Sequence, residues 1–354
     1  MPQEGVKGLR ERLASGETIL AAEGFVFEME RRGHLMAGPF VPEVVIENPE
    51  LVTQLTEEFV HAGSDVVLAF TYYGHREKLR IVGRENDLEK LNRKALEIAR
   101  DVATRTGTLM AGNICNTTCY NPTEPDNNEE AKRIFKEQVE WAVEGGADFI
   151  LAETYNDFGE AKLALEAIKQ YGKGLPSVIC LTPQTDLLTR DGLTYDVACR
   201  KLEEAGADVV GLNCNFGPET IIAEMKKIRK ACKGPLACLP VTYRTTPEQP
   251  QMQSLTLPNG KRAFYENLDH FCCSRDEMVK FGEACKEIGI QYVGLCCGNS
   301  SRYFRKLAET LGRRPPACRY SPNMKLHFVY GEHESLRKWN TSGLKKIYTP
   351  AEAS

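Results

Sequence analysis

Three cysteines stand where the sequence predicts that two buried strands end. Cys214 closes the apolar part of Gly211-Leu-Asn-Cys-Asn-Phe-Gly, and Cys296 and Cys297 close that of Gly294-Leu-Cys-Cys-Gly. Three thiolates without a fourth protein ligand are typical of a catalytic zinc site that keeps one position open. Soft sulfur ligands also favour zinc over magnesium or calcium.

The adjacent pair can share one ion only under a structural condition. Neighbouring residues on a strand point to opposite faces, so the strand must end at Cys296 and Cys297. Gly298 follows them, and a glycine permits the turn that this requires. The alternative is that all three are buried core cysteines. A Cys-Cys-Gly at one strand end and a cysteine at another favour the metal site.

Such a site predicts a particular chemistry. A zinc ion held only by thiolates is electron-rich and therefore a modest Lewis acid for carbonyls. It is better suited to holding a substrate thiol as a thiolate, because a free thiol has a pKa of about 8.5 and metal coordination removes its proton at neutral pH. The sequence therefore predicts alkyl transfer to a thiol.

The elements that position these residues are eight short runs rich in Val, Ile and Leu. Near-continuous apolar runs of this length are typical of strands buried on both faces. Helical patterns separate them, for example at 129–144 and 193–204. The runs lie at residues 19–25, 65–71, 109–115, 148–154, 176–182, 208–214, 235–241 and 291–297.

Eight strand–helix units predict an α/β fold of the (β/α)8 barrel class over residues 1–312. The competing doubly wound sheet would carry a glycine-rich phosphate-binding turn after its first strand, and this chain has none there. In a barrel, the loops after the strands build the active site. The long connections after the second, third and seventh strands are therefore expected to surround the cysteines.

Residues 313–354 differ from the rest of the chain in charge. They hold eight Lys or Arg and three Glu, a net charge of +5, which leaves −9 for residues 1–312 of a chain whose net charge is −4. We expect a basic C-terminal arm that lies over the barrel or over a second subunit, where it would serve oligomerisation. The competing interpretation is a solvated tail.

Composition limits the partners and the compartment. Complete pairing of 13 cysteines within one chain is impossible, and the N-terminal residues lack the apolar stretch of a secretory signal. No apolar run predicts a membrane span, and a net charge of −4 predicts no nucleic-acid surface. We expect a cytoplasmic homo-oligomer that acts on small molecules.

The sequence resembles the zinc-dependent homocysteine S-methyltransferase family, and its betaine-dependent members most. The resemblance covers roughly residues 8–312, and the paired cysteine motifs are its most specific part. The other matching stretches are Gly24-Phe-Val-Phe, Arg31-Arg-Gly, Ala37-Gly-Pro-Phe-Val-Pro-Glu, Glu58-Phe-Val-His-Ala-Gly-Ser, Phe70-Thr-Tyr-Tyr and Ala152-Glu.

This resemblance implies a (β/α)8 barrel that binds Zn²⁺ through Cys214, Cys296 and Cys297. Homocysteine would be the methyl acceptor and methionine the product. The donor would be an onium compound, either betaine or a related ammonium or sulfonium compound. No cofactor other than zinc is implied.

The resemblance also implies which residues bind the substrates. Glu153 matches the carboxylate that holds the homocysteine ammonium, and a buried carboxylate does need a cationic partner. Phe40, Tyr72 and Tyr73 match the aromatic residues around the donor's quaternary ammonium. The faces of aromatic rings attract such cations without hydrogen bonds.

Two departures from the family pattern concern the acceptor and the metal. The family's aspartate after the first strand is Ala22 here, and Glu23 follows it. Glu23 is the candidate to reach the ammonium by a different path. Leu295 replaces a glycine before the cysteine pair and adds bulk there.

Two further departures concern the donor. Phe40 stands where the family usually has tryptophan, and Thr154 where the betaine enzymes have tyrosine, so Tyr155 is the candidate substitute. The identity of the donor therefore stays open. Ala22 and Leu295 also leave two alternatives, a methyltransferase with another thiol acceptor and a non-catalytic or re-purposed zinc-binding barrel.

Overall fold

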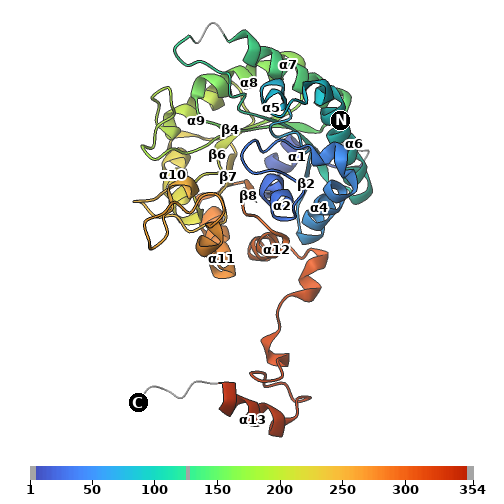
Figure 1. The fold of residues 1–354 in the computed structure, drawn as a ribbon, viewed down its shortest axis with the longest axis vertical. Helices are drawn as coiled ribbons and strands as arrows, with labels where there is room; N and C mark the ends of the chain where they lie inside the picture. Colours follow the sequence, from blue (N-terminus) through green and yellow to red (C-terminus); the bar gives the residue numbers. More distant parts are fainter. Residues whose placement is uncertain (1–4, 125–127, 349–354) are drawn as a thin grey trace.

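Eight parallel strands close into a barrel in which each strand pairs with the next and β8 pairs with β1. The computed structural model describes residues 5–124 and 128–348. The predicted (β/α)8 fold and all eight predicted strands are confirmed (Figure 1). The strands are β1 (Ile19–Ala22), β2 (Val66–Leu68), β3 (Leu109–Cys115), β4 (Phe149–Tyr155), β5 (Ser177–Leu181), β6 (Val209–Asn213), β7 (Leu236–Leu239) and β8 (Tyr292–Leu295).

Helices surround the barrel and connect its strands. The predicted helix at 129–144 has the bounds of α7, and the one predicted at 193–204 begins two residues later as α9. The helices of the barrel are α1 (Leu9–Ala14), α2 (Phe25–Arg31), α3 (Val44–Glu47), α4 (Pro49–Ala62), α5 (Arg76–Ile81), α6 (Leu88–Thr106), α7 (Glu129–Glu144), α8 (Phe158–Tyr171), α9 (Tyr195–Glu204), α10 (Pro218–Ala231), α11 (Arg275–Ile288) and α12 (Ser301–Thr310).

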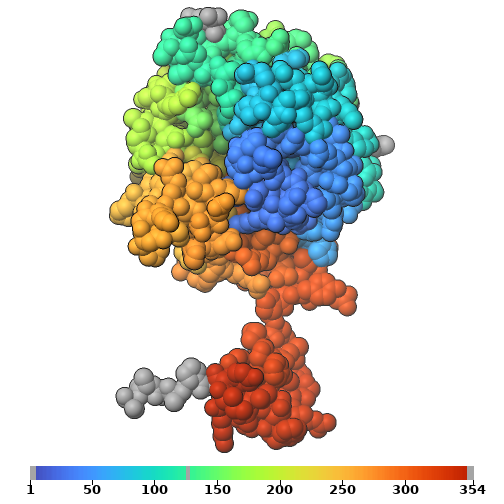
Figure 2. All heavy atoms as spheres, in the orientation of Figure 1, coloured from blue at the N-terminus to red at the C-terminus, as the bar shows by residue number. Residues whose placement is uncertain are grey.

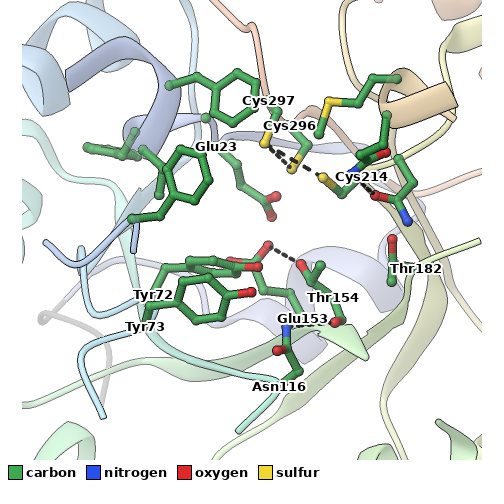
Figure 3. Close-up of a pocket in the computed structure, with 18 of the residues that line it drawn as sticks. Glu23, Tyr72, Tyr73, Asn116, Glu153, Thr154, Thr182, Cys214, Cys296 and Cys297 are labelled. Atoms are coloured by element: carbon green, nitrogen blue, oxygen red, sulfur yellow. Dashed lines mark hydrogen bonds between the residues drawn. The ribbon is translucent and has the colours of Figure 1, made fainter. Parts of the chain in front are cut away.

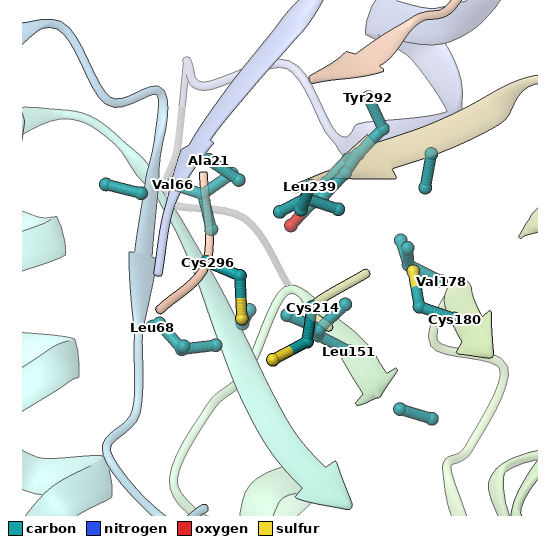
Figure 4. Close-up of a cluster of buried hydrophobic side chains, with 14 of the residues drawn as sticks. Ala21, Val66, Leu68, Leu151, Val178, Cys180, Cys214, Leu239, Tyr292 and Cys296 are labelled. Carbon is teal, nitrogen blue, oxygen red and sulfur yellow. The ribbon is translucent and has the colours of Figure 1, made fainter. Parts of the chain in front are cut away.

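The interior of the barrel is a packed apolar core. Every residue of the eight strands is buried, as expected for strands covered by helices on one face and by the barrel interior on the other. Figure 4 shows side chains from several strands meeting there, among them Leu151, Val178 and Tyr292. Cys214 and Cys296 belong to the same cluster, so the candidate ligands lie at the edge of the core.

The longest loop joins β7 to α11 and is fastened over the rim. Within it lie the short helices η2 (Met252–Ser254) and η3 (Leu268–Phe271). The Tyr265 hydroxyl donates a hydrogen bond to Glu30 at 2.6 Å, and Arg31 donates one to the Tyr243 hydroxyl at 2.8 Å. These bonds connect the loop to α2, so that loop residues can line the mouth of the barrel.

Residues 313–348 form an arm that leaves the barrel (Figures 1 and 2). Its elements are η4 (Pro316–Tyr320), which packs on α4 and α12, then η5 (Met324–Leu326) and α13 (Lys338–Tyr348), which buries none of its residues. Large apolar side chains exposed together on one segment usually mark an interaction site. The large apolar residues exposed on the arm are Tyr320, Met324, Leu326, Phe328, Tyr330, Trp339, Ile347 and Tyr348.

Two further findings concern the cysteines and the helices. All 13 cysteines are free. Within residues 5–124 and 128–348, no helix combines the length and the apolar character that crossing a membrane requires.

Candidate functional site

A cavity of about 390 Å³ opens at the carboxyl ends of the strands. Figure 3 shows the three cysteines on one side of it, Glu23 and Glu153 beneath them, and the tyrosines 72 and 73 beside the carboxylates. The sequence predicted that these residues would meet, and the closure of the barrel brings them together. None of the described residues that line this cavity is Arg, Lys or His.

The spacing of the three thiols suits one metal ion. The Sγ atoms of Cys214 and Cys297 lie 3.6 Å apart, and those of Cys296 and Cys297 lie 4.0 Å apart. Tetrahedral zinc with Zn–S bonds of about 2.3 Å places its sulfur ligands roughly 3.8 Å from one another. The donor set and its spacing therefore fit zinc without any large movement of these side chains.

The backbone explains how adjacent cysteines reach the same point. Strand β8 ends at Leu295, directly before the pair, as the shared metal site requires. Gly298 then turns with a φ of 81°. Cys214 follows the last residue of β6 and has a φ of 60°. Such left-handed backbone is uncommon outside glycine and often marks functional positions.

The turn after β8 is fastened to the end of β1. Asn299 donates a hydrogen bond from Nδ2 to the backbone oxygen of Glu23 at 2.9 Å, and its backbone N–H donates to the oxygen of Cys296 at 3.0 Å. Gly24 makes this approach possible, because a Cβ at that position would lie 2.6 Å from the oxygen of Cys296. The turn that carries the cysteine pair thus depends on residues of the first strand's loop.

Glu153 is held by amide and hydroxyl donors. Asn113 donates to its Oε1 at 2.6 Å, Asn213 donates to its Oε2 at 2.8 Å, and the Thr154 hydroxyl lies 3.4 Å from Oε2. The residue is 3% exposed, and this burial raises the pKa of the carboxyl above its usual value, while the hydrogen bonds oppose the rise. Such donors orient the carboxylate and stabilise its charged form.

Glu23 lies in the same cavity without comparable support. Its side chain is also 3% exposed, yet neither carboxylate oxygen has a hydrogen-bond partner in the part of the chain that the structure describes. Burial and the neighbouring charge of Glu153 raise the pKa of Glu23 well above its usual value. Oxygen atoms of Glu23 and Glu153 and the sulfur of Cys296 all lie within 4.8 Å of one another.

The opposite part of the lining is aromatic. Tyr72 and Tyr73 lie with ring centroids 4.4 Å apart, and Phe40 stacks on Phe27 at 5.9 Å. All three predicted aromatic residues, Phe40, Tyr72 and Tyr73, line the cavity. Phe264 from the long β7–α11 loop also lines it, which the sequence alone did not indicate.

The structure does not bring Tyr155 into the cavity. Its neighbour Thr154 lines the cavity, and because side chains alternate along a strand, Tyr155 points the other way. The Tyr155 ring is fully buried and packs against Phe135 of α7, with centroids 6.0 Å apart. The expectation that Tyr155 replaces the family's tyrosine at position 154 is corrected accordingly.

Several amide residues of the site escaped the sequence analysis. Asn113 had a usable signal, since it is the one amide side chain within the apolar run at 109–115. The others lie in loops, where nothing in the local pattern marks them. The carboxamides that line the cavity are Asn116, Asn156, Gln184, Asn215, Gln251 and Gln253.

Comparison with known proteins gives a consistent result. Residues 22–311 match the family model described as homocysteine S-methyltransferase. Betaine–homocysteine S-methyltransferase 1 of Xenopus tropicalis is 35% identical over 339 residues, which cover 93% of this chain and 81% of that protein. The mouse S-methylmethionine–homocysteine S-methyltransferase BHMT2 is 32% identical over 322 residues, covering 88% of this chain and 84% of that protein.

A solved structure shares the fold. The metallated form of the homocysteine methyltransferase MmuM from Escherichia coli superimposes with a TM-score of 0.67 at 19% sequence identity. The match covers 85% of this chain and 99% of that one.

The close approach at Gly24 generates a prediction. Gly24→Ala should displace Cys296 and weaken Co²⁺ binding by the cysteines, measured by the sulfur-to-cobalt charge-transfer absorption. Gly33→Ala is the matched control, because Gly33 also has a positive φ but a Cβ there meets nothing within 4 Å. Both variants should lose about 1–2 kcal/mol of unfolding free energy through backbone strain. Equal cobalt affinity in the two variants would contradict the prediction.

Proposed function

This chain belongs to the homocysteine S-methyltransferase family, and we propose that it transfers a methyl group from an onium donor to the thiol of homocysteine, giving methionine. The donor is betaine or a related ammonium or sulfonium compound. The observation that carries this proposal is the convergence of three thiols, two buried carboxylates and an aromatic wall in one cavity.

We propose that Cys214, Cys296 and Cys297 hold zinc. Their sulfur spacing of 3.6 and 4.0 Å supports this. When bound by three thiolates, a zinc ion would lower the pKa of a substrate thiol, so that the thiolate forms at neutral pH.

The carboxylates are proposed to orient the acceptor. Glu153 accepts hydrogen bonds from Asn113 and Asn213, so its oxygens are held in place before a substrate ammonium arrives. No described residue that lines the cavity is cationic. The ammonium of the acceptor would therefore bring a positive charge to the two buried carboxylates. Glu23 offers a second carboxylate for the same group.

The aromatic wall is proposed to bind the donor. An onium group has no N–H to donate, and ring faces attract it through their quadrupoles. The rings of Tyr72, Tyr73 and Phe40 would hold it with one methyl carbon aimed at the acceptor sulfur. Direct displacement then forms the carbon–sulfur bond while the electron pair of the broken bond returns to the donor nitrogen or sulfur. Positioning of both reactants accounts for much of the rate enhancement.

The two departures that favoured other functions lie outside the cavity. Ala22 and Leu295 are 3% and 0% exposed, and neither lines the cavity. The bulk of Leu295 is accommodated in the core instead of beside the substrate. The methyltransferase therefore remains the function that the site supports best, with a different thiol acceptor as the alternative.

We further propose a cytoplasmic homo-oligomer in which the arm at 313–354 docks on a second copy. Thirteen free cysteines support a reducing compartment. The arm exposes large apolar residues and carries a charge of +5, opposite in sign to the −9 of residues 1–312. Its residues 349–354 lie outside the described part of the chain.

The metal and the activity are tested together by removing one ligand. Wild-type protein should contain one zinc per chain and methylate homocysteine. Cys297→Ser should lose both, by at least roughly 100-fold in zinc affinity, which is the upper range for removing even an outer-shell partner. Cys318→Ser, a change of the same kind at a half-buried cysteine of the arm, should lose neither. Stoichiometric zinc and full activity in Cys297→Ser would refute the assignment.

The donor wall is tested by changing one ring. Tyr72→Ala should raise the KM for the onium donor about tenfold, since a desolvated cation–ring contact contributes about 1–2 kcal/mol. The KM for homocysteine should stay the same. Tyr72→Phe keeps the ring face and should behave as wild type toward the donor. An equal rise in both KM values for Tyr72→Ala would contradict the assignment of Tyr72 to donor binding.

The role of the arm is tested by molar mass in solution. Full-length protein should be oligomeric by light scattering, and a chain that ends at Gly312 should be monomeric. Lys345→Glu with Lys346→Glu in the full chain should weaken assembly, because the arm would then lose its opposite charge. A truncated chain with the full assembly state would show that the arm has no such role.

A further inference from the structure

Two buried carboxylates face the same cavity but differ in their surroundings. Glu153 accepts hydrogen bonds from Asn113 and Asn213, one on each oxygen. Glu23 is equally buried, and neither of its oxygens has a partner among the described residues. A carboxylate taken out of water without hydrogen bonds is strongly destabilised unless a cation compensates it.

The chain itself offers no such cation. No described residue that lines the cavity is Arg, Lys or His. Lys78 is nearby, but its ammonium lies 3.9 Å from the ring centroid of Tyr73, and it is not part of the lining. A cation that binds in the cavity would supply the positive charge that stabilises an ionised Glu23.

The geometry directs Glu23 toward the cysteines. Residue pairing places Ala22 opposite Leu295, and the backbone N–H of Glu23 donates to the oxygen of Leu295 at 3.0 Å. Glu23 thus follows β1 at the same level at which Cys296 follows β8. A carboxylate oxygen of Glu23 lies within 4.8 Å of the sulfur of Cys296, which also belongs to the three-thiol group. Figure 3 shows the Glu23 carboxylate between the thiols and Glu153.

The lengths of zinc–ligand bonds set how close Glu23 and the thiols must lie to share one ion. Carboxylate oxygens bind zinc at about 2.0–2.2 Å and thiolates at about 2.3 Å, so an oxygen and a sulfur on one ion lie roughly 3.5 Å apart. An oxygen of Glu23 already lies within 4.8 Å of the Cys296 sulfur, and sharing one ion with the thiols would require it to move closer. Glu153 is a poorer candidate, because Asn113 and Asn213 already hold both of its oxygens.

We propose that Glu23 is the fourth ligand of the metal ion in the substrate-free protein, and that a substrate thiol displaces it. This inference rests on the proposed three-cysteine metal site. In the exchange one metal–oxygen bond is replaced by one metal–sulfur bond, and the proton of the thiol passes to water. The released carboxylate is then free to face the ammonium of the acceptor.

The experiment uses the full chain loaded with Co²⁺ or Zn²⁺ and a thiol that has no ammonium, 2-mercaptoethanol. Glu23→Gln should bind metal at least about tenfold more weakly than wild type without thiol. It should bind 2-mercaptoethanol more tightly by a similar factor, because the thiol no longer competes with a carboxylate. Both affinities can be followed by the cobalt absorption spectrum.

Glu160→Gln is the matched control, since it makes the same chemical change at a buried glutamate that does not line the cavity. It should leave the metal affinity and the affinity for 2-mercaptoethanol at their wild-type values. Glu23→Asp keeps the charge but withdraws the oxygens by one methylene, and its metal affinity should also fall. X-ray absorption of the wild-type zinc protein should show three sulfurs and one oxygen, and four sulfurs after the thiol is added.

Unchanged metal and 2-mercaptoethanol affinities in Glu23→Gln and Glu23→Asp would overturn the inference and leave Glu23 to the substrate ammonium alone. That result is distinct from failure of the proposed function, in which wild-type protein would hold no metal on its cysteines. A wild-type zinc shell of four sulfurs without added thiol would also overturn it.

Discussion

An accumulation of acidic groups in a buried cavity is the constraint on which the rest of the site depends. Three thiols and two carboxylates converge at one end of the barrel, and no described lining residue brings a positive charge. Such groups are costly to ionise away from water unless cations compensate them. We therefore expect bound cations to compensate the charges of these groups. In the proposed reaction the cations are a metal ion, an ammonium and an onium group.

The barrel creates this arrangement through register. Strands β1 and β8 are neighbours, and the pairing of Ala22 with Leu295 brings Glu23 level with Cys296. Likewise Cys115, the last residue of β3, pairs with Glu153 near the end of β4, so this carboxylate lies at the same rim. Because parallel strands all end at one side, residues distant in sequence reach a common cavity without a dedicated domain.

The sequence was sufficient for the parts of the site that depend on strand ends. The apolar runs placed Cys214 and the cysteine pair at the rim, and the structure agrees, with β6 ending at Asn213 and β8 at Leu295. It was insufficient for Tyr155, because a shift of one residue along a strand reverses the direction of the side chain. The register between β4 and β5 is itself irregular between Ala152 and Tyr155.

Residues supplied by long loops were beyond sequence reasoning for a different reason. Gln251, Gln253 and Phe264 reach the cavity because the β7–α11 loop is fastened to α2 by Tyr265 and Arg31, through contacts between segments more than 200 residues apart. No local pattern encodes such contacts. Strand periodicity predicts where a chain emerges from the core, whereas loop conformation depends on which distant partners it meets.

The neutral character of the remaining lining follows from the same constraint. An arginine or lysine beside Glu23 and Glu153 would form a buried ion pair and remove the need for a cationic ligand. Carboxamides such as Gln184 and Gln253 provide hydrogen bonds without that charge. Aromatic rings complete the wall, since they attract an onium group that cannot donate hydrogen bonds. In the proposed reaction, selectivity for positively charged substrates would therefore depend on the absence of Arg, Lys and His from the described lining as well as on the acids that it contains.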